Sequence, residues 1–479
     1  MDGFRFRCYP TEAQAQTLRQ WIGCQRFIYN AKVGEDRYFR RFAKSALQLT
    51  GTPIPIDQCY AQFKTEQTPF LAEVPGVILR NGAVRWKQAY GRYFAGLGGR
   101  PTIKTRHGRQ SVWITRELFE LEPIEDAPRA YRLRIGTRKF PVGELAFTAH
   151  RDFEPPASLH ISLEAGRWHV SFSNETATEI LSEKAIAERL QQLPIEQLEA
   201  ATLGLDRGVA TPVMTSDGQR IVASPVQQQR LAQKERRRKR WQRKLARRCK
   251  GGKNRAKARE QVARTYRYAS DVRRDLAHKA ARILVDEPRH QVYALEALQV
   301  QQMTKRAKAK PDPERPGHYL PNNAKAKSGL NKSILASGWG QFKTILRNKA
   351  ARAGKLVVEV PAAYSSQECA RCGHIHPDNR PSQARFVCQA CGHQAHADIN
   401  AAQVIAARGA RWVADGHVVA KPKKRCALRR TTVGPGEAEP AGFTPRTPVE
   451  NAIRRCRGNT SAHRSMKQEP PATSQRLSR

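Results

Sequence analysis

The sequence has little negative charge and no long apolar stretch. Its 479 residues include 42 Asp and Glu against 85 Lys and Arg, which gives a formal net charge of +43. No apolar run approaches the roughly 20 residues that a membrane-spanning helix needs, and no signal-peptide pattern opens the chain. These absences argue against a membrane partner, and we expect a cytoplasmic protein.

The scarcity of acids points to a polyanionic partner, most plausibly nucleic acid. Between Arg230 and Arg259 there are sixteen basic residues and one acid, Glu235. A run this one-sided predicts a surface that follows phosphates, which carry no base identity. The sequence shows no helix-turn-helix or zinc-finger array that could recognise a long site in the major groove, so sequence specificity must come from elsewhere.

Cysteines outside one short segment follow no spacing pattern, as expected for reduced thiols. Within that segment, Cys369 and Cys372 form one Cys-x-x-Cys pair, and Cys388 and Cys391 form a second pair after fifteen residues. A glycine follows each pair, and the spacing is that of a structural site for one zinc ion with four thiolate ligands. Unrelated buried thiols or two disulfides are the alternatives. Four nearby histidines could also replace a thiolate ligand: His374, His376, His393 and His396.

The remaining chain predicts an α/β protein of two to four domains. A strand at the N-terminus precedes a mostly helical stretch to about residue 97. Short alternating strands up to about residue 172 then indicate a small antiparallel barrel, to which the first strand is expected to belong. Apolar runs near 201–222 predict a hairpin sheet, and helices and strands alternate from there to about residue 407.

Three carboxylates occupy corresponding places in this pattern. Asp206 ends the first hairpin strand, Glu296 ends a later apolar strand, and Asp398 starts the last helix. In an RNase H-like fold these places meet at one edge, where three carboxylates would repel one another without divalent ions. We therefore predict two catalytic Mg²⁺ ions that hydrolyse a phosphodiester, with Asp206 as the bridging ligand and Glu296 and Asp398 holding one ion each. Asn400 is a further candidate for an outer contact.

These residues resemble the TnpB (OrfB) family of transposon-encoded RNA-guided DNA endonucleases, relatives of the small type V CRISPR effectors. The resemblance extends from about Phe4 to Gly409. Its motifs include 204–208 around Asp206, 295–298 around Glu296, 364–367 before the cysteines and 397–402 around Asp398. The family usually has an acid where Ala297 follows Glu296, and this difference could tune metal affinity.

The resemblance implies a split RuvC-like nuclease domain with a zinc-ribbon insertion, plus an N-terminal wedge barrel with a helical recognition insert. It also implies a guide RNA from the element's own end, double-stranded DNA as the target, and a location in the bacterial cytosol or nucleoid. Base pairing then reads the target. The expected boundaries are 1–175 for the wedge barrel with its insert at about 12–97, 176–200 for a connector, 201–363 for the first two nuclease parts with basic helices at 225–286, 364–396 for the zinc ribbon, 397–412 for the third nuclease part and 413–479 for a basic, disordered tail.

Two other functions remain open at this stage. One is an RNA-guided DNA-binding regulator that never cleaves, although members of that kind typically lose catalytic carboxylates and all three are present here. The other is a zinc-ribbon protein that binds RNA, for example at the ribosome, against which the carboxylates and the size argue. The sequence leaves the oligomeric state open.

Overall fold

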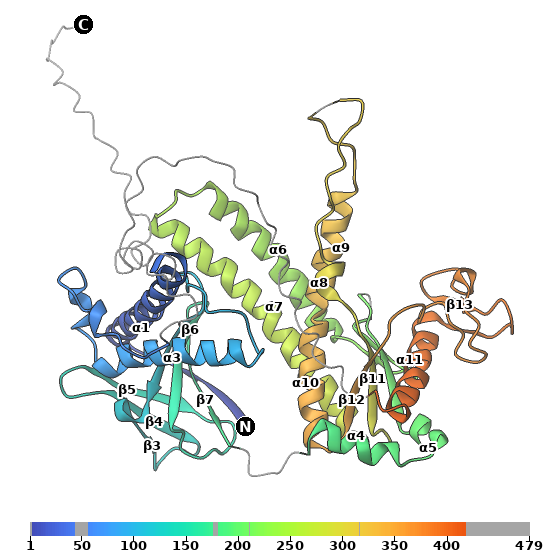
Figure 1. The fold of residues 1–479 in the computed structure, drawn as a ribbon, viewed down its shortest axis with the longest axis horizontal. Helices are drawn as coiled ribbons and strands as arrows, with labels where there is room; N and C mark the ends of the chain where they lie inside the picture. The colour runs from blue at the N-terminus through green and yellow to red at the C-terminus, as the bar shows by residue number, and fades with distance from the viewer. Residues whose placement is uncertain (1, 44–55, 176–180, 210, 316, 418–479) are drawn as a thin grey trace, which may run out of the picture. The chain divides into compact units, whose positions relative to one another are not determined.

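The computed structural model describes residues 2–43, 56–175, 181–209, 211–315 and 317–417 (Figure 1). The chain divides into two compact units, one within the first 176 residues and one from residue 177 onward. The tail predicted to be disordered, 413–479, lies outside the described residues from residue 418. No helix among the described residues is long and apolar enough to cross a membrane.

The N-terminal unit contains a seven-stranded antiparallel sheet in the order β2-β6-β7-β1-β5-β4-β3. Its strands are β1 (Asp2–Cys8), β2 (Gln110–Thr115), β3 (Phe119–Pro123), β4 (Ala130–Gly136), β5 (Pro141–Thr148), β6 (Ser158–Glu164) and β7 (Arg167–Asn174). Strand β1 lies in the middle, which confirms that the N-terminal strand belongs to this sheet. The described strand order ends at β2 and β3, so closure into a barrel stays a prediction.

Two long helices lie in the chain between β1 and β2. Helix α1 (Glu12–Tyr38) begins with a capping box, in which Thr11 and Gln14 satisfy each other's backbone N–H groups. Helix α3 (Gly76–Phe94) packs on α1. Trp86 and Tyr90 of α3 are buried in an aromatic cluster with α1 and belong to the core.

The C-terminal unit is built on a five-stranded sheet in the order β10-β9-β8-β11-β12. Its strands are β8 (Thr202–Asp206), β9 (Val213–Thr215), β10 (Arg220–Ile221), β11 (Val292–Glu296) and β12 (Leu356–Val360). The first three pair antiparallel, with Gly218 at a φ of +87° in the second turn, whereas β11 and β12 run parallel to β8. The predicted hairpin followed by alternating helices and strands is confirmed.

Helices cover both faces of this sheet because alternate strand residues point to opposite faces. Helices α7 (Lys253–Asp286) and α10 (Trp339–Arg352) pack on the face that carries Leu203, Tyr293 and Val357. Helices α4 (Glu183–Gln191), α5 (Ile195–Ala200) and α11 (Ala397–Ala414) cover the other face.

The segment expected to be a polar connector, 176–200, contributes to this core instead. Ile186, Leu190 and Leu198 are buried with residues of β11 and β12. Their helices are so short and polar outside these positions that the apolar stripe is sparse in the sequence. The part of 176–200 that the structure describes therefore belongs to the C-terminal unit, and describing it as a connector was wrong.

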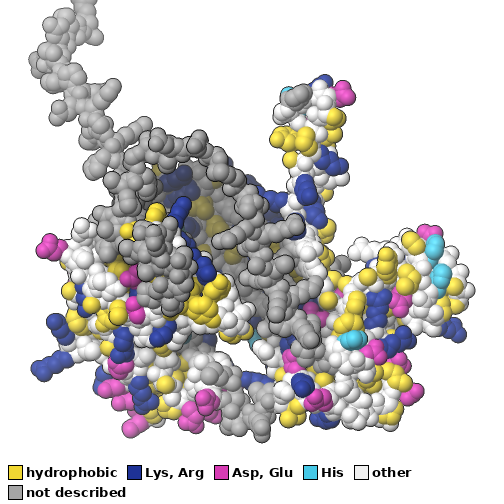
Figure 2. Space-filling view, in the orientation of Figure 1, with side chains coloured by type: hydrophobic (Ala, Val, Ile, Leu, Met, Phe, Trp, Pro, Cys, Tyr) yellow, Lys and Arg dark blue, Asp and Glu magenta, His cyan; other side chains and the backbone are white. Residues whose placement is uncertain are grey.

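The basic region forms two helices, as predicted. Helix α6 (Pro225–Arg247) buries none of its residues, and Gly251, at a φ of +91°, lies in the turn that leads into α7. After the short helix α8 (Val300–Met303), helix α9 (Ala324–Ser337) and the loop before it project from the unit (Figure 1). Lys and Arg side chains gather on this projection (Figure 2).

Helix α11 approaches the sheet closely at two glycines. A Cβ atom on Gly204 of β8 would lie 1.9 Å from the carbonyl oxygen of Ala402, and one on Gly409 of α11 would lie 2.4 Å from the Cβ atom of Ala294. Backbone therefore packs against backbone at Gly204, and this contact fixes where α11 crosses the sheet. The helix is longer than predicted and ends at Ala414 instead of near Ala407.

We predict that Gly204→Ala lowers the free energy of unfolding by about 1–3 kcal/mol or more, because α11 must shift to admit the methyl group. Chemical denaturation followed by circular dichroism measures this change. The control is Gly340→Ala in α10, where the added Cβ meets nothing within 4 Å and Ala favours the helix. Equal stability of the two variants would contradict the close contact.

Candidate active site and four-cysteine metal centre

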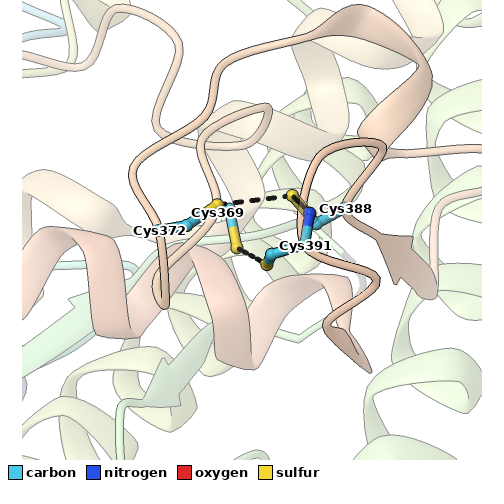
Figure 3. A group of neighbouring side chains, drawn as sticks. All are labelled: Cys369, Cys372, Cys388 and Cys391. Atoms are coloured by element: carbon cyan, nitrogen blue, oxygen red, sulfur yellow. Dashed lines mark hydrogen bonds between the residues drawn. The ribbon is translucent and has the colours of Figure 1, made fainter.

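The four predicted cysteines come together. The sulfur atoms of Cys369 and Cys391 lie 3.7 Å apart and those of Cys372 and Cys388 lie 3.5 Å apart (Figure 3). All four sulfurs lie within 4.8 Å of one another. A tetrahedral ion with metal–sulfur bonds of about 2.3 Å, the value for zinc, places its sulfur ligands about 3.8 Å apart. The cluster therefore fits zinc, and none of the four cysteines is in a disulfide.

Each Cys-x-x-Cys pair sits in a turn of the same design. In the first turn, Cys369 N–H donates to His374 O (3.0 Å), and Gly373, at a φ of +74°, donates to Cys369 O (2.9 Å). The second turn repeats both bonds, from Cys388 N–H to His393 O (2.9 Å) and from Gly392 N–H to Cys388 O (3.1 Å). The left-handed backbone explains the glycine after each pair.

The side-chain amide of Asn400 links the first cysteine turn to helix α11. Asn400 is fully buried. Its Nδ2 donates to Glu368 O (2.7 Å), and its Oδ1 accepts from Ala370 N–H (3.0 Å). The hairpin of β13 (Arg385–Val387) and β14 (Gln394–His396) leads directly into the same helix. Both hydrogen-bonding ends of the amide are therefore used by the backbone, and Asn400 is not available for the predicted outer contact.

The three predicted carboxylates lie near one another. In the parallel register Leu205 of β8 lies opposite Leu295 of β11, so Asp206 and Glu296 follow at the same edge of the sheet. Asp398 is in the first turn of α11, which packs on both strands. Glu296 is buried, and the other two are partly buried.

The electrostatics show how close the carboxylates are. Burial, followed by the negative charges of Glu296 and Asp398, raises the pKa of Asp206 to about 7. Three acids arranged in this way favour a cation among them. Oxygen ligands of this kind suit Mg²⁺, so the residues present fit a divalent metal ion.

Neighbouring side chains hold two of the carboxylates in place. The hydroxyl of Ser365, which is buried, donates to Glu296 Oε1. The buried Arg207 side chain donates to the backbone oxygen of Glu296. Arg380, from the segment between the cysteine pairs, donates to Asp398 Oδ1 (3.1 Å). Each carboxylate keeps oxygen lone pairs for another partner.

Sequence reasoning missed the roles of these three residues. Ser365 and Arg207 belong to the short motifs around 364–367 and 204–208, so their positions were marked but not their contacts. Arg380 lies in the fifteen-residue spacer between the cysteine pairs, where no pattern singles it out.

Family models match three parts of the chain. A model described as "Probable transposase" of the OrfB IS605 type matches residues 185–307, and one described as "Cas12f1-like, TNB domain" matches residues 339–405. A third, described as "Helix-turn-helix domain" of the same OrfB IS605 type, matches residues 1–33. In the structure those residues form β1 and part of the single helix α1, with no second helix among the residues described there.

Two curated relatives match nearly the whole chain. The "Putative RNA-guided DNA endonuclease InsQ" of Escherichia coli (strain K12) is 27% identical over 420 residues, 88% of this chain and 95% of its own. The "Putative RNA-guided DNA endonuclease" of Streptomyces pristinaespiralis is 28% identical over 444 residues, 90% of this chain and 94% of its own. A "CRISPR-associated endodeoxyribonuclease Cas12f1" of Sulfoacidibacillus thermotolerans is 50% identical over 58 residues, 12% of this chain and 14% of its own.

Among solved structures, the complex of Cas12f1 with single guide RNA and target DNA matches with a TM-score of 0.46 at 13% identity, covering 82% of each chain. The mini-RNA-guided endonuclease CRISPR-Cas phi3 matches with a TM-score of 0.42 at 10% identity, covering 85% of this chain and 92% of its own.

We predict that the purified protein holds one zinc ion per chain and that Cys372→Ser loses it, because the fourth ligand of the tetrahedron is removed. Elemental analysis of the pure protein measures the metal, and limited proteolysis should show cleavage within 364–396 in the variant. Cys249→Ser changes an exposed cysteine outside the cluster and should retain the zinc. A wild-type protein without zinc would refute the assignment.

Proposed function

We propose that the chain belongs to the TnpB (OrfB) family and is an RNA-guided DNA endonuclease that hydrolyses phosphodiesters at Asp206, Glu296 and Asp398. The observation that carries this proposal is the position of these three carboxylates at one sheet edge, where burial and then the charges of Glu296 and Asp398 raise the pKa of Asp206 to about 7. Relatives that match 88% and 90% of the chain bear the name RNA-guided DNA endonuclease.

The topology of the C-terminal unit supports a RuvC-like, RNase H-type nuclease domain. Three antiparallel strands followed by two parallel strands is the order that this fold requires, and Asp206 and Glu296 end two neighbouring strands of the sheet. The four-cysteine segment interrupts this domain between β12 and α11. We assign the N-terminal unit as a wedge domain with a helical recognition insert that contains α1 and α3.

Each of the three carboxylates would have its own role in holding the metal ions. Asp206, whose pKa both other carboxylates raise, would be shared between two divalent ions, while Glu296 and Asp398 would each hold one. Two such ions, for which Mg²⁺ is the natural choice, supply an activated water and stabilise the leaving oxygen of the phosphodiester. Ser365 fixes one oxygen of Glu296, and Arg380 holds Asp398.

The basic surface of α6 supports binding to a nucleic-acid backbone. Six cations lie along one side of the helix at helical spacing and share a groove with Trp241; they are Arg236, Arg237, Arg240, Arg243, Lys244 and Arg247. Such a surface follows phosphates without distinguishing bases. Sequence is then supplied by a guide RNA, which we expect to derive from the end of the element, paired with target DNA.

We predict that Asp206→Asn, Glu296→Gln and Asp398→Asn each reduce cleavage at least 100-fold, because each removes a charged ligand of the ions. RNA and target binding should persist. The assay is cleavage of a target plasmid in Mg²⁺ by protein produced with its flanking RNA, and the control Glu188→Gln changes an exposed carboxylate of α4.

A scrambled guide in the same assay tests RNA guidance. Cleavage that ignores the guide sequence would make the protein a nonspecific nuclease. Binding that follows the guide without any cleavage by the wild type would make it a regulator. A carboxylate variant that still cleaves would remove that residue from the site.

We also predict that Ser365→Ala raises the Mg²⁺ concentration needed for half-maximal cleavage about 10–100-fold, the usual effect of losing a hydrogen bond to a metal ligand. A titration of Mg²⁺ measures it, and saturating metal should restore most of the rate. Ser366→Ala removes the adjacent hydroxyl and is the control. Equal titration curves for both variants would show that the Ser365 bond to Glu296 does not matter for metal binding.

A further inference from the structure

A pocket lined by positive charges lies among α1, α3 and the segment before β2 in the N-terminal unit. The space open to the centre of a water-sized sphere is about 20 Å³, and the surrounding empty space, open solvent included, is about 300 Å³. The lining carries four cations and two hydroxyl groups, and none of the residues that line it is Asp or Glu. The charged and hydroxyl residues are Arg26, Arg85, Lys104, Arg109, Tyr29 and Ser111.

Positive charges in this pocket crowd one another. Burial, followed by the charges of Arg85 and Arg109, lowers the pKa of Lys104 to about 7. Burial, with a contribution from Arg109, also lowers the pKa of Arg85. Elsewhere in the same unit, the buried ammonium of Lys32 is paired with two carboxylates, Glu35 and Asp57. No comparable carboxylate lines the pocket.

The fold holds Lys104 in this position. Asn30 of α1 accepts from the backbone N–H of Lys104 (2.8 Å) and donates to its carbonyl oxygen (2.9 Å). The ammonium then lies 3.4 Å from the centre of the Tyr29 ring. Since the backbone alone makes the anchoring bonds, the charged end of Lys104 is not needed to place the segment.

Ser111 adds a hydrogen-bonding group at the pocket. The hydroxyl oxygen of Ser111 is buried and has no hydrogen-bond partner within the described part of the chain. Arg26 reaches Gln110 Oε1 through Nη1 (2.8 Å). A buried polar atom without a partner usually marks a ligand, water or ion that completes it.

We propose that this pocket is an anion site for one phosphate group, held by Arg85, Lys104 and Arg109 with the Ser111 hydroxyl as an added donor. Guanidinium and ammonium donors around a cavity without acids are the groups that bind phosphate most strongly. The choice of phosphate over other anions rests on the proposed function, because RNA and DNA strands carry it. The occupant is a phosphodiester of a bound strand or a free phosphate ion.

An anion site and a purely structural cluster of cations predict different effects of a Lys104 substitution on the unfolding temperature. Crowded cations destabilise the protein without its ligand. Lys104→Met, which keeps the chain length, should therefore unfold at the same temperature as the wild type or higher. A purely structural role of the ammonium predicts the opposite, a lower unfolding temperature.

The first experiment is thermal unfolding of the full-length chain, freed of nucleic acid, in inorganic phosphate or in chloride at equal ionic strength. A ligand of the folded state raises its stability by mass action. We expect phosphate to raise the unfolding temperature of the wild type and of Arg106→Gln, an exposed matched control outside the pocket. In Lys104→Met the phosphate affinity should fall about tenfold.

The second experiment measures equilibrium binding of single-stranded RNA and of duplex DNA by the same variants, which requires no cleavage activity. If Lys104→Met binds RNA or DNA more weakly than Arg106→Gln does, the occupant is a phosphodiester of a bound strand. This holds whether or not inorganic phosphate raises the unfolding temperature of the wild type. If Lys104→Met binds RNA and DNA as the control does but phosphate no longer raises its unfolding temperature, the occupant is a free phosphate ion. If Lys104→Met fails to fold, Arg85→Gln replaces it.

Two results would overturn the proposal. One is a phosphate shift of full size in Lys104→Met, which would place phosphate elsewhere. The other is no phosphate shift in the wild type together with equal strand binding by Lys104→Met and Arg106→Gln. Either result leaves the proposed nuclease untouched, since the carboxylate variants are tested by cleavage.

Discussion

The direct contact of helix α11 with the central strands is the constraint on which the C-terminal unit depends. At Gly204 no side chain separates the helix from β8, and at Gly409 the helix itself lacks one. Because both glycines set the height and the crossing point of the helix, the first turn of α11 arrives at the ends of β8 and β11. The position of Asp398 beside Asp206 is thus a result of backbone packing rather than of attraction between side chains.

The backbone packing brings carboxylates of like charge together, although they repel one another. Burial, followed by the negative charges of Glu296 and Asp398, raises the pKa of Asp206 to about 7. The neighbouring Ser365 and Arg380 bind the outer two carboxylates without neutralising the set. By contrast, Glu359 on the adjacent strand is paired with Lys343 at 2.9 Å.

The sequence predicts the elements that depend on local patterns. The capping box at Thr11, the break at Gly251 and the strand that ends at Glu296 all follow from spacing and residue type, and so do the four cysteines. Contacts between distant segments were not predictable in this way. Asn400 was expected at the active site and binds backbone instead, because an amide near a carboxylate has the same sequence pattern in both roles.

The other features that the sequence did not predict also depend on contacts between distant segments. The residues of α4 and α5 fill the sheet's core from short polar helices, so their few apolar positions form no clear stripe. The pocket around Lys104 is assembled from α1, α3 and an irregular segment, and no motif connects Tyr29, Arg85 and Lys104. Composition predicts that the protein binds phosphates, but only the assembled structure shows where cations lack acidic partners.

The order of the three carboxylates along the chain has a consequence for synthesis. Asp206 and Asp398 are separated by both long basic helices and by the four-cysteine segment. A ribosome adding about 5–20 residues each second therefore exposes Asp206 on the order of ten seconds or more before α11 emerges. During that interval the nascent chain carries the basic helices while the group of three carboxylates is still incomplete. Synthesis from the N-terminus thus completes the basic surface before the acidic group.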